Sequence, residues 1–258
     1  MNLQLKNQLF LVCGASSGFG HAIAEQLLAE KASVIAVARR EEKLEKLGRA
    51  FPGKVQAIVG DISTETTQNE IENTIRGRQL HGALINAGGP PALSTLETSM
   101  SDWDEAYASV MRWKIELTLR LVPHFLTYKY GRILFIESQS VKQPLTSLAL
   151  SNSFRAGVVG FAKTLALEVA PKGITINTMA PGSHNTPAIE RVLKKQMEQS
   201  GKSYEDVKKA ADADIPVGRM GEARELASLA TWLLSPVAGF VTGQTISHDG
   251  GNVRGLFG

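Results

Sequence analysis

The sequence predicts an α/β fold, namely one doubly wound domain with about seven parallel strands and helices on both faces of the sheet. Short, largely apolar segments recur along the chain, as expected for parallel strands that are covered by helices on both sides. Stretches with helical apolar spacing lie between them, and this alternation is typical of βαβ crossovers. Because no repeat, linker or low-complexity run divides the 258 residues, we expect a single domain over residues 1–258.

The apolar segments give the strands in chain order. The predicted strands are Leu9–Cys13, Val34–Ala38, Val55–Val59, Ala83–Asn86, Arg132–Ile136, Thr175–Met179 and a last one near Gln244–His248. The first helix is predicted over Gly20–Lys31, and the next contains Leu44 and Leu47. Two longer helices are predicted over Trp103–Val122 and Ala156–Val169. The second of them is so apolar that it must be buried or lie at an interface.

An insertion of about residues 183–215 follows the sixth predicted strand. It contains an amphipathic pattern with helical spacing, formed by Ile189, Val192, Leu193, Gln196 and Met197. Ligands of α/β folds bind at the carboxyl ends of the strands, where this insertion begins. We therefore predict a helical substrate lid, with a surface decoration as the alternative.

The composition excludes several classes of protein. Hydrophobic residues make up 43% and charged residues 21% of the chain, which excludes disorder, collagen-like repeats and coiled coils. The 28 basic and 25 acidic residues form no basic cluster, so we expect no nucleic-acid partner. The single cysteine, Cys13, gives no disulfide framework and no metal cluster. With neither a signal-like start nor an apolar run of about 18 residues, the sequence predicts a cytoplasmic protein without a membrane partner.

A glycine-rich segment joins the first predicted strand to the first predicted helix: Gly14-Ala15-Ser16-Ser17-Gly18-Phe19-Gly20. Glycines at such a turn let the backbone approach a pyrophosphate, which then lies at the positive N-terminus of the helix. This position between strand and helix predicts a dinucleotide site. The residues predicted to bind the cofactor here are Gly14, Ser16, Ser17, Gly18, Phe19 and Gly20.

The end of the second strand indicates which nicotinamide cofactor is bound. A carboxylate there would bind both ribose hydroxyls and repel a 2′-phosphate, but this chain has Ala38 followed by Arg39 and Arg40. Guanidinium groups pair well with phosphate, so the sequence favours NADP(H) over NAD(H). We expect Arg39 to be the main contact and Arg40 a secondary one, with a solvated basic start to a helix as the alternative.

Four later motifs follow in order: Asp61-Ile62, Asn86-Ala87-Gly88, Pro181-Gly182 with Thr186, and Asp249-Gly250-Gly251. Together with the glycine-rich segment they resemble the short-chain dehydrogenase/reductase family over essentially the whole chain, and most closely its 3-oxoacyl-carrier-protein reductase type. The resemblance implies an NAD(P)-binding Rossmann domain that assembles as a homotetramer or homodimer and acts on a small molecule. It implies that Asp61 holds the adenine amino group and that Thr186 contacts the carboxamide or diphosphate. The segments implied to line the cofactor are Asp61 and Ile62; Asn86, Ala87 and Gly88; and Pro181, Gly182 and Thr186.

Three of the four catalytic positions of the family carry other residues in this chain. The family uses an Asn, a Ser and a Tyr-x-x-x-Lys pair. Ser138 matches the serine, whereas Val110 replaces the Asn, Ser151 the Tyr and Arg155 the Lys. A serine hydroxyl is much less acidic than a phenol. Arginine is always protonated, so Arg155 can hold the ribose or stabilise an anion but cannot relay protons.

The missing proton donor has several candidates. His184 follows the Pro181-Gly182 turn and Tyr204 lies in the predicted lid, although a loop histidine and a solvated tyrosine are the simpler interpretations. Glu137 and Lys114 could also point inward, but strand-edge and surface positions are the favoured interpretation for both.

Three functions remain open. The first is an NADP(H)-dependent oxidoreductase acting on a carbonyl, hydroxyl or related group, in which Ser138 and Ser151 orient the substrate and Arg155 stabilises developing negative charge. The second is a catalytically silent NADP(H)-binding sensor or scaffold. The third is a lyase or isomerase that uses the fold without net redox chemistry.

Overall fold

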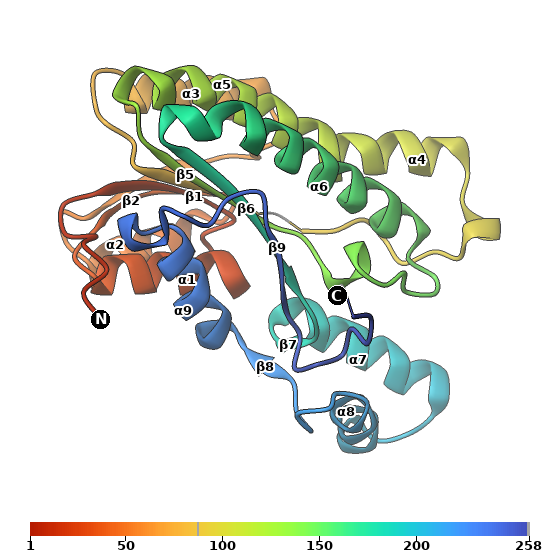
Figure 1. The fold of residues 1–258 in the computed structure, drawn as a ribbon. Coiled ribbons are helices and arrows are strands. Elements are labelled where there is room, and N and C mark those ends of the chain that lie inside the picture. Colours follow the sequence, from red (N-terminus) through yellow and green to blue (C-terminus); the bar gives the residue numbers. More distant parts are fainter. Residues whose placement is uncertain (87, 257–258) are drawn as a thin grey trace.

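A seven-stranded sheet forms the centre of the protein, which a computed structural model describes for residues 1–86 and 88–256 (Figure 1). The strands are β1 (Leu9–Cys13), β2 (Ser33–Ala38), β3 (Val55–Val59), β4 (Gly82–Ile85), β5 (Gly131–Ile136), β6 (Ile174–Pro181) and β9 (Thr245–His248). They are ordered β3-β2-β1-β4-β5-β6-β9, and every pair of neighbours is parallel. The predicted doubly wound α/β fold with seven parallel strands is therefore confirmed.

Helices cover both faces of this sheet (Figure 1). The main helices are α1 (Gly18–Ala29), α2 (Glu41–Ala50), α3 (Glu65–Ile75), α4 (Met100–Ala106), α5 (Trp113–Tyr128), α6 (Ala149–Val169) and α9 (Ala223–Leu233). A π-helical segment, η2 (Tyr107–Arg112), connects α4 to α5. The short 3₁₀ turns are η1 (Thr95–Glu97), η3 (Gln139–Val141), η4 (Ala170–Lys172) and η5 (Pro236–Ala238).

Along the central strands, successive apolar side chains point alternately into two separate hydrophobic cores, one on each face of the sheet. In β1, Leu9, Leu11 and Cys13 pack under α3, α5 and α6. Phe10 and Val12 pack on the opposite face, under α1, α2 and α9. This arrangement explains why β1 is apolar at every position, since neither of its faces reaches water.

Strand β3 departs from the expected burial. In this segment only Ile58 is buried, and its other residues are partly or fully exposed. The expectation of a strand buried on both faces is wrong here, because β3 lies at the edge of the sheet and helices cover it incompletely.

The insertion after β6 forms a small helical unit at one end of the sheet (Figure 1). Its elements are β7 (His184–Asn185), α7 (Pro187–Ser200), α8 (Tyr204–Ala213) and β8 (Gly221–Glu222). The two helices enclose a core of their own formed by Leu193, Val207, Ile215 and Met220. The predicted apolar stripe is only partly right, because Val192 is 48% exposed and Gln196 is exposed as well. Because this core is small, it buries Leu193 and part of Ile189 and Met197, and the other residues of the predicted stripe face the solvent.

Among the described residues, no helix combines the length and the apolar character needed to cross a membrane.

Candidate active site

The carboxyl ends of the parallel strands meet at one edge of the sheet, where the glycine-rich segment follows β1. Gly14 has a φ of +72°, and a Cβ at this position would lie only 2.8 Å from Nδ2 of Asn86. That amide in turn donates to the Cys13 carbonyl at 3.4 Å. A Cβ on Gly20 would overlap the Gly14 carbonyl. The ends of β1, β4 and α1 are thus packed closely, and the loop backbone stays accessible to a ligand.

The N-terminus of α1 fits an anionic ligand. Ser17 occupies the N-cap, but within the described part of the chain its side chain makes no capping hydrogen bond and the first turn of α1 holds no acidic residue. The backbone N–H groups of this turn can therefore be satisfied by a phosphate. A Cβ on Gly18 would lie 3.9 Å from the Thr186 methyl group, so Thr186 borders the same loop.

The two arginines after β2 take different positions. The Arg40 guanidinium reaches the glycine-rich segment and donates to the hydroxyls of Ser16 at 2.8 Å and Ser17 at 2.6 Å. Arg39 is 80% exposed at its side chain and lies 3.9 Å from an Asp61 carboxylate oxygen. This geometry favours Arg40 over Arg39 as the group that faces a phosphate near the loop.

Asp61 and Ile62 lie at the carboxyl end of β3, beside this loop. Asp61 accepts hydrogen bonds from the Ser63 N–H at 2.9 Å and the Ser63 hydroxyl at 2.7 Å. These bonds, aided by Arg39, hold the pKa of the Asp61 carboxyl below its usual value. Ile62 packs against the core. Gly88 is exposed after β4, whereas the predicted contact Ala87 lies outside the described residues.

Pro181 ends β6, and Gly182 makes a close turn against the loop after β9. A Cβ on Gly182 would lie 2.8 Å from the Cβ of Asp249, so this position requires glycine. Thr186 follows and becomes the N-cap of α7. The Pro181-Gly182 motif and the Asp249-Gly250-Gly251 motif of the resemblance are thus adjacent in space.

Of the three predicted catalytic residues, one lies just after β5 and two lie on α6. Ser138 follows β5, and its Oγ accepts from the Ser140 N–H at 3.1 Å. Ser151 lies in the first turn of α6, with Arg155 one turn later. The Arg155 Nε donates to the Ser151 Oγ at 3.0 Å. The two substituted positions therefore interact directly.

A buried ion cluster lies beside these serines and involves Lys114, Glu137 and Arg155. The Glu137 carboxylate accepts from Lys114 Nζ at 2.5 Å and from Arg155 Nη1 at 3.1 Å. Arg155 Nη1 also donates to the Glu137 carbonyl at 3.2 Å. The side chains of Lys114 and Glu137 are 0% exposed and that of Arg155 is 9% exposed. The favoured strand-edge and surface interpretation of Lys114 and Glu137 is therefore wrong, because opposite charges let both side chains be buried.

Burial lowers the pKa of the Lys114 ammonium group. Desolvation is the largest effect and lowers the pKa of the Lys114 ammonium from 10.5 to about 8, although the nearby Glu137 carboxylate opposes this shift. Arg155 adds to the lowering because it is a second cation close to the ammonium.

Val110, at the family's Asn position, is fully buried inside the π-helical segment. Lys114 comes one turn later and is buried at the start of α5. π-helical segments are frequent at functional sites, and this one lies directly before the helix that supplies Lys114.

His184 and Tyr204 do not join the catalytic positions. The His184 ring bonds to the Gly182 carbonyl at 3.0 Å and to the His248 ring at 2.8 Å, and it packs edge-on against Phe19. Burial lowers the pKa of His184. Tyr204 packs against the small core of the insertion. Neither side chain supplies a proton donor beside Ser138 in this structure.

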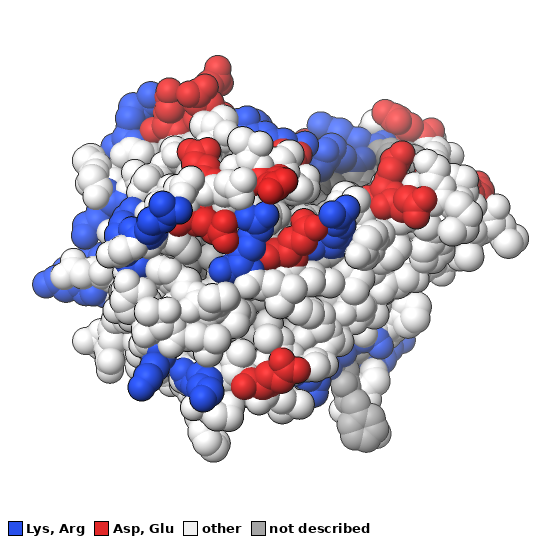
Figure 2. Space-filling model, turned by 90° about the horizontal axis from the view of Figure 1, so that it is seen from above, with Lys and Arg blue, Asp and Glu red and all other residues white. Residues whose placement is uncertain are grey.

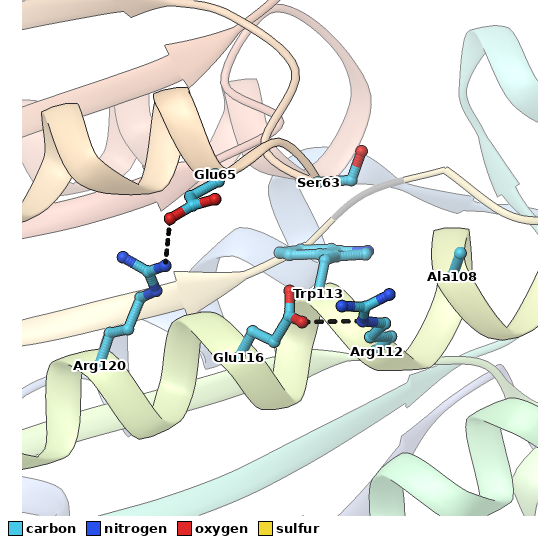
Figure 3. Close-up of a pocket in the computed structure, with 7 residues that line it drawn as sticks. All are labelled: Ser63, Glu65, Ala108, Arg112, Trp113, Glu116 and Arg120. Carbon is cyan, nitrogen blue, oxygen red and sulfur yellow. Dashed lines mark hydrogen bonds and ion pairs between the residues drawn. The ribbon is translucent and has the colours of Figure 1, made fainter.

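A polar hollow of about 240 Å³ lies beside α5, near the start of α3 (Figure 3). Figure 3 shows Arg112 turned toward Glu116 and Arg120 turned toward Glu65. Since acids pair with both arginines, the charges that line this hollow compensate each other. Among the described residues, no three His, Cys, Asp or Glu side chains gather as metal ligands.

Comparisons with known proteins agree with this architecture. The family model described as Enoyl-(Acyl carrier protein) reductase matches residues 14–252. Nodulation protein G of Rhizobium sp. (strain N33) is 32% identical over 251 residues, covering 96% of this chain and 98% of the relative. The 3-oxoacyl-[acyl-carrier-protein] reductase FabG of Haemophilus influenzae is 30% identical over 255 residues, with 96% and 98% coverage.

Solved structures are similar over the same length. L-Sorbose reductase from Gluconobacter frateurii, complexed with NADPH and L-sorbose, has a TM-score of 0.93 at 25% identity and covers 99% of this chain and 100% of its own. An actinorhodin polyketide ketoreductase variant with NADPH has a TM-score of 0.90 at 29% identity, with 96% and 98% coverage.

The fold and the order of the motifs along it define an oxidoreductase of the doubly wound α/β class. The chain belongs to the short-chain dehydrogenase/reductase family, in the group that the enoyl-(acyl carrier protein) reductase model describes, and it is similar to FabG.

The lowered pKa of Lys114 predicts a stability change at alkaline pH. The folded protein releases the Lys114 proton near pH 8, whereas the unfolded chain keeps it up to about pH 10.5. In this window the unfolded state binds more protons, so the free energy of unfolding rises with pH, by about 1 kcal/mol from about pH 8 to about pH 9. Urea unfolding of wild type and of Lys114→Met at both pH values measures the difference. An identical pH dependence of the two proteins would contradict the assignment.

Proposed function

We propose that the protein is an NADP(H)-dependent oxidoreductase that acts on a carbonyl, hydroxyl or related group through a non-standard active site. The observation that carries the proposal is that Ser138, Ser151 and Arg155 come together after β5 and at the start of α6, at the same edge of the sheet from which the glycine-rich loop leaves β1. The family to which the chain belongs supports it, and the solved structures of L-sorbose reductase and the actinorhodin ketoreductase contain NADPH.

The residues present fit a nicotinamide dinucleotide. The close contacts of Gly14 with Asn86 and the uncapped N-terminus of α1 leave room and N–H donors for a pyrophosphate. Asp61 and Asn86 would lie on the adenosine side, while Thr186 would lie nearer the nicotinamide. When bound, NADPH supplies a hydride to the acceptor carbon of the substrate.

Arg40 would determine the preference for NADP(H). Its guanidinium is already held at the loop by Ser16 and Ser17, and a 2′-phosphate placed there would gain a charge-assisted pair. No acidic side chain follows β2 directly to repel the phosphate, since Arg39 and Arg40 precede the first acid, Glu41.

Removing the Arg40 side chain tests the cofactor preference. We expect Arg40→Ala to raise the Kd for NADPH about 10- to 100-fold, which corresponds to one lost charge-assisted contact, and to leave the Kd for NADH unchanged. Arg39→Ala is the matched control and should have a smaller effect, because Arg39 is turned toward Asp61. Isothermal titration with both cofactors measures this. Equal weakening of NADPH and NADH binding by Arg40→Ala would contradict the proposal.

Ser138, Ser151 and Arg155 would assist the reaction without a positioned phenol. Ser138 and Ser151 would orient the acceptor through their hydroxyl groups, and Arg155 would stabilise the negative charge that hydride addition leaves on the substrate oxygen. Neither serine is acidic enough to replace a phenol, so water would supply the final proton. Loss of a positioned general acid costs about 10²- to 10⁴-fold in rate. Hydride geometry and charge stabilisation would remain.

Turnover measurements test this reaction. With NADPH and a panel of ketones, oxoacyl thioesters and enoyl thioesters, we expect loss of NADPH absorbance on at least one substrate. We also expect Ser138→Ala and Arg155→Ala to reduce that loss at least about tenfold, because each removes a contact to the developing charge. If NADPH binds tightly but no substrate is reduced, the alternative function of a catalytically silent NADP(H) sensor or scaffold takes the place of the oxidoreductase.

The insertion of residues 183–215 would act as the substrate lid. Helices α7 and α8 lie beyond the carboxyl end of β6 and enclose a small core of their own, so they can move as a unit. A reducing compartment, and hence the cytoplasm, stays our prediction for the location.

We also propose that the chain assembles as a homotetramer or homodimer through the layer of α5 and α6. Figure 2 shows this side of the molecule, where acidic and basic side chains lie side by side next to a broad area without charge. The exposed large apolar side chains of η2, α5 and α6 are Tyr107, Leu119, Leu126, Tyr128 and Leu167. Burying such side chains against a second copy is favourable.

Light scattering is expected to give two or four times the chain mass of 27.8 kDa. A particle mass equal to that of one chain would contradict assembly.

A further inference from the structure

The buried ion cluster carries an excess of positive charge. Lys114 and Arg155 both pair with Glu137, and among the described residues no other carboxylate forms an ion pair with either cation. Two cations and one anion leave one positive charge uncompensated, at side chains that are between 0% and 9% exposed. A buried charge without a partner is costly, so a bound anion at this place would stabilise the site.

Arg155 presents a free donor away from the cluster. Its Nε is bonded to Ser151 and its Nη1 to Glu137, but within residues 1–86 and 88–256 its Nη2 has no hydrogen-bond partner. A Cβ on Gly89 would lie 2.9 Å from this nitrogen, so Nη2 points to the loop that follows β4. The unpaired amino group is thus directed to the carboxyl edge of the sheet, where ligands bind in this class of fold.

The neighbouring hydroxyl groups are also available as donors. The Ser151 Oγ accepts a hydrogen bond from Arg155, and the Ser138 Oγ accepts one from the Ser140 backbone. Each hydroxyl therefore keeps its own hydrogen free to donate. The edge formed by these residues offers N–H and O–H donors together with net positive charge, a combination that matches a carboxylate better than a neutral ketone.

The dinucleotide does not supply this anion. Under the proposed function, its phosphates lie at the N-terminus of α1 and at Arg40, which is hydrogen-bonded to Ser16 and Ser17 on the β1–β2 side of the sheet. Arg155 lies on α6, which packs on β6 on the other side of β4. The negative group has to come from the second ligand of the site.

We propose that Arg155, together with the hydroxyls of Ser151 and Ser138, binds a carboxylate of the substrate, close to the carbon that is reduced. The substrate class is then an oxo acid or a related unsaturated acid rather than a neutral ketone. Glu137 is a positioning residue, because it accepts from Arg155 and holds the guanidinium so that Nη2 faces the substrate. Lys114 in turn holds the Glu137 carboxylate. This inference rests on the proposed function for the reaction but concerns substrate binding alone.

Paired ligands of equal shape test the proposal. Isothermal titration of the full-length protein, with and without NADPH, compares benzoate with benzamide and acetate with acetamide. We expect each carboxylate to bind at least about tenfold more tightly than its amide. Arg155→Gln should reduce this ratio to about one, and Arg155→Lys should retain part of it, since the lysine keeps the charge but not the fixed direction.

Lys163→Gln is the matched control, because it removes one exposed cation from the same helix, and it should leave the ratio unchanged. Equal binding within both pairs, no binding of any carboxylate, or an unchanged ratio in Arg155→Gln would each overturn the proposal. NADPH binding is followed separately by fluorescence. If NADPH fails to bind while carboxylates are still preferred, the proposed function fails and the carboxylate site stands.

Discussion

The buried carboxylate of Glu137 connects three elements that form the active-site edge. It lies directly after β5, and it accepts from Lys114 at the start of α5 and from Arg155 in α6. Because the side chains are almost completely shielded from water, removing the Glu137 carboxylate would leave the Lys114 and Arg155 cations buried without a partner, at a cost of about 3–5 kcal/mol. The positions of α5 and α6 relative to the sheet edge therefore depend on this contact as well as on apolar packing.

The same contact explains how the catalytic substitutions fit together. The side chain of Arg155 ends in a planar guanidinium group and reaches further than a lysine side chain would. Glu137 and Ser151 each accept a hydrogen bond from this group, so two of its three nitrogens are held in place. A phenol at position 151 is absent, and the serine in its place accepts from the arginine. Under the proposed function, a fixed positive charge takes the place of a group that can transfer a proton, and such a charge acts on anions.

The nucleotide side of the molecule is independent of these changes. The close packing around Gly14 and Gly20 is set by backbone contacts among β1, β4 and α1. The contact of Arg40 with the loop joins the ends of β1 and β2. None of these interactions involves the ion cluster, so the non-standard active site of the proposed function leaves the features that fit a dinucleotide unchanged.

The sequence by itself determined the strands and the glycine-rich loop, because these depend on local apolar pattern and on backbone freedom. Ser138, Ser151 and Arg155 were identified through the resemblance to the family. The sequence did not determine the burial of Lys114 and Glu137, since charged residues normally lie at the surface and these partners are 23 residues apart in the chain. The exposure of β3 followed from its place at the sheet edge, and the contact of Arg40 with Ser16 joins residues 24 apart. Only the tertiary structure decides such features, because they depend on which strands become neighbours and on whether a buried charge finds a partner.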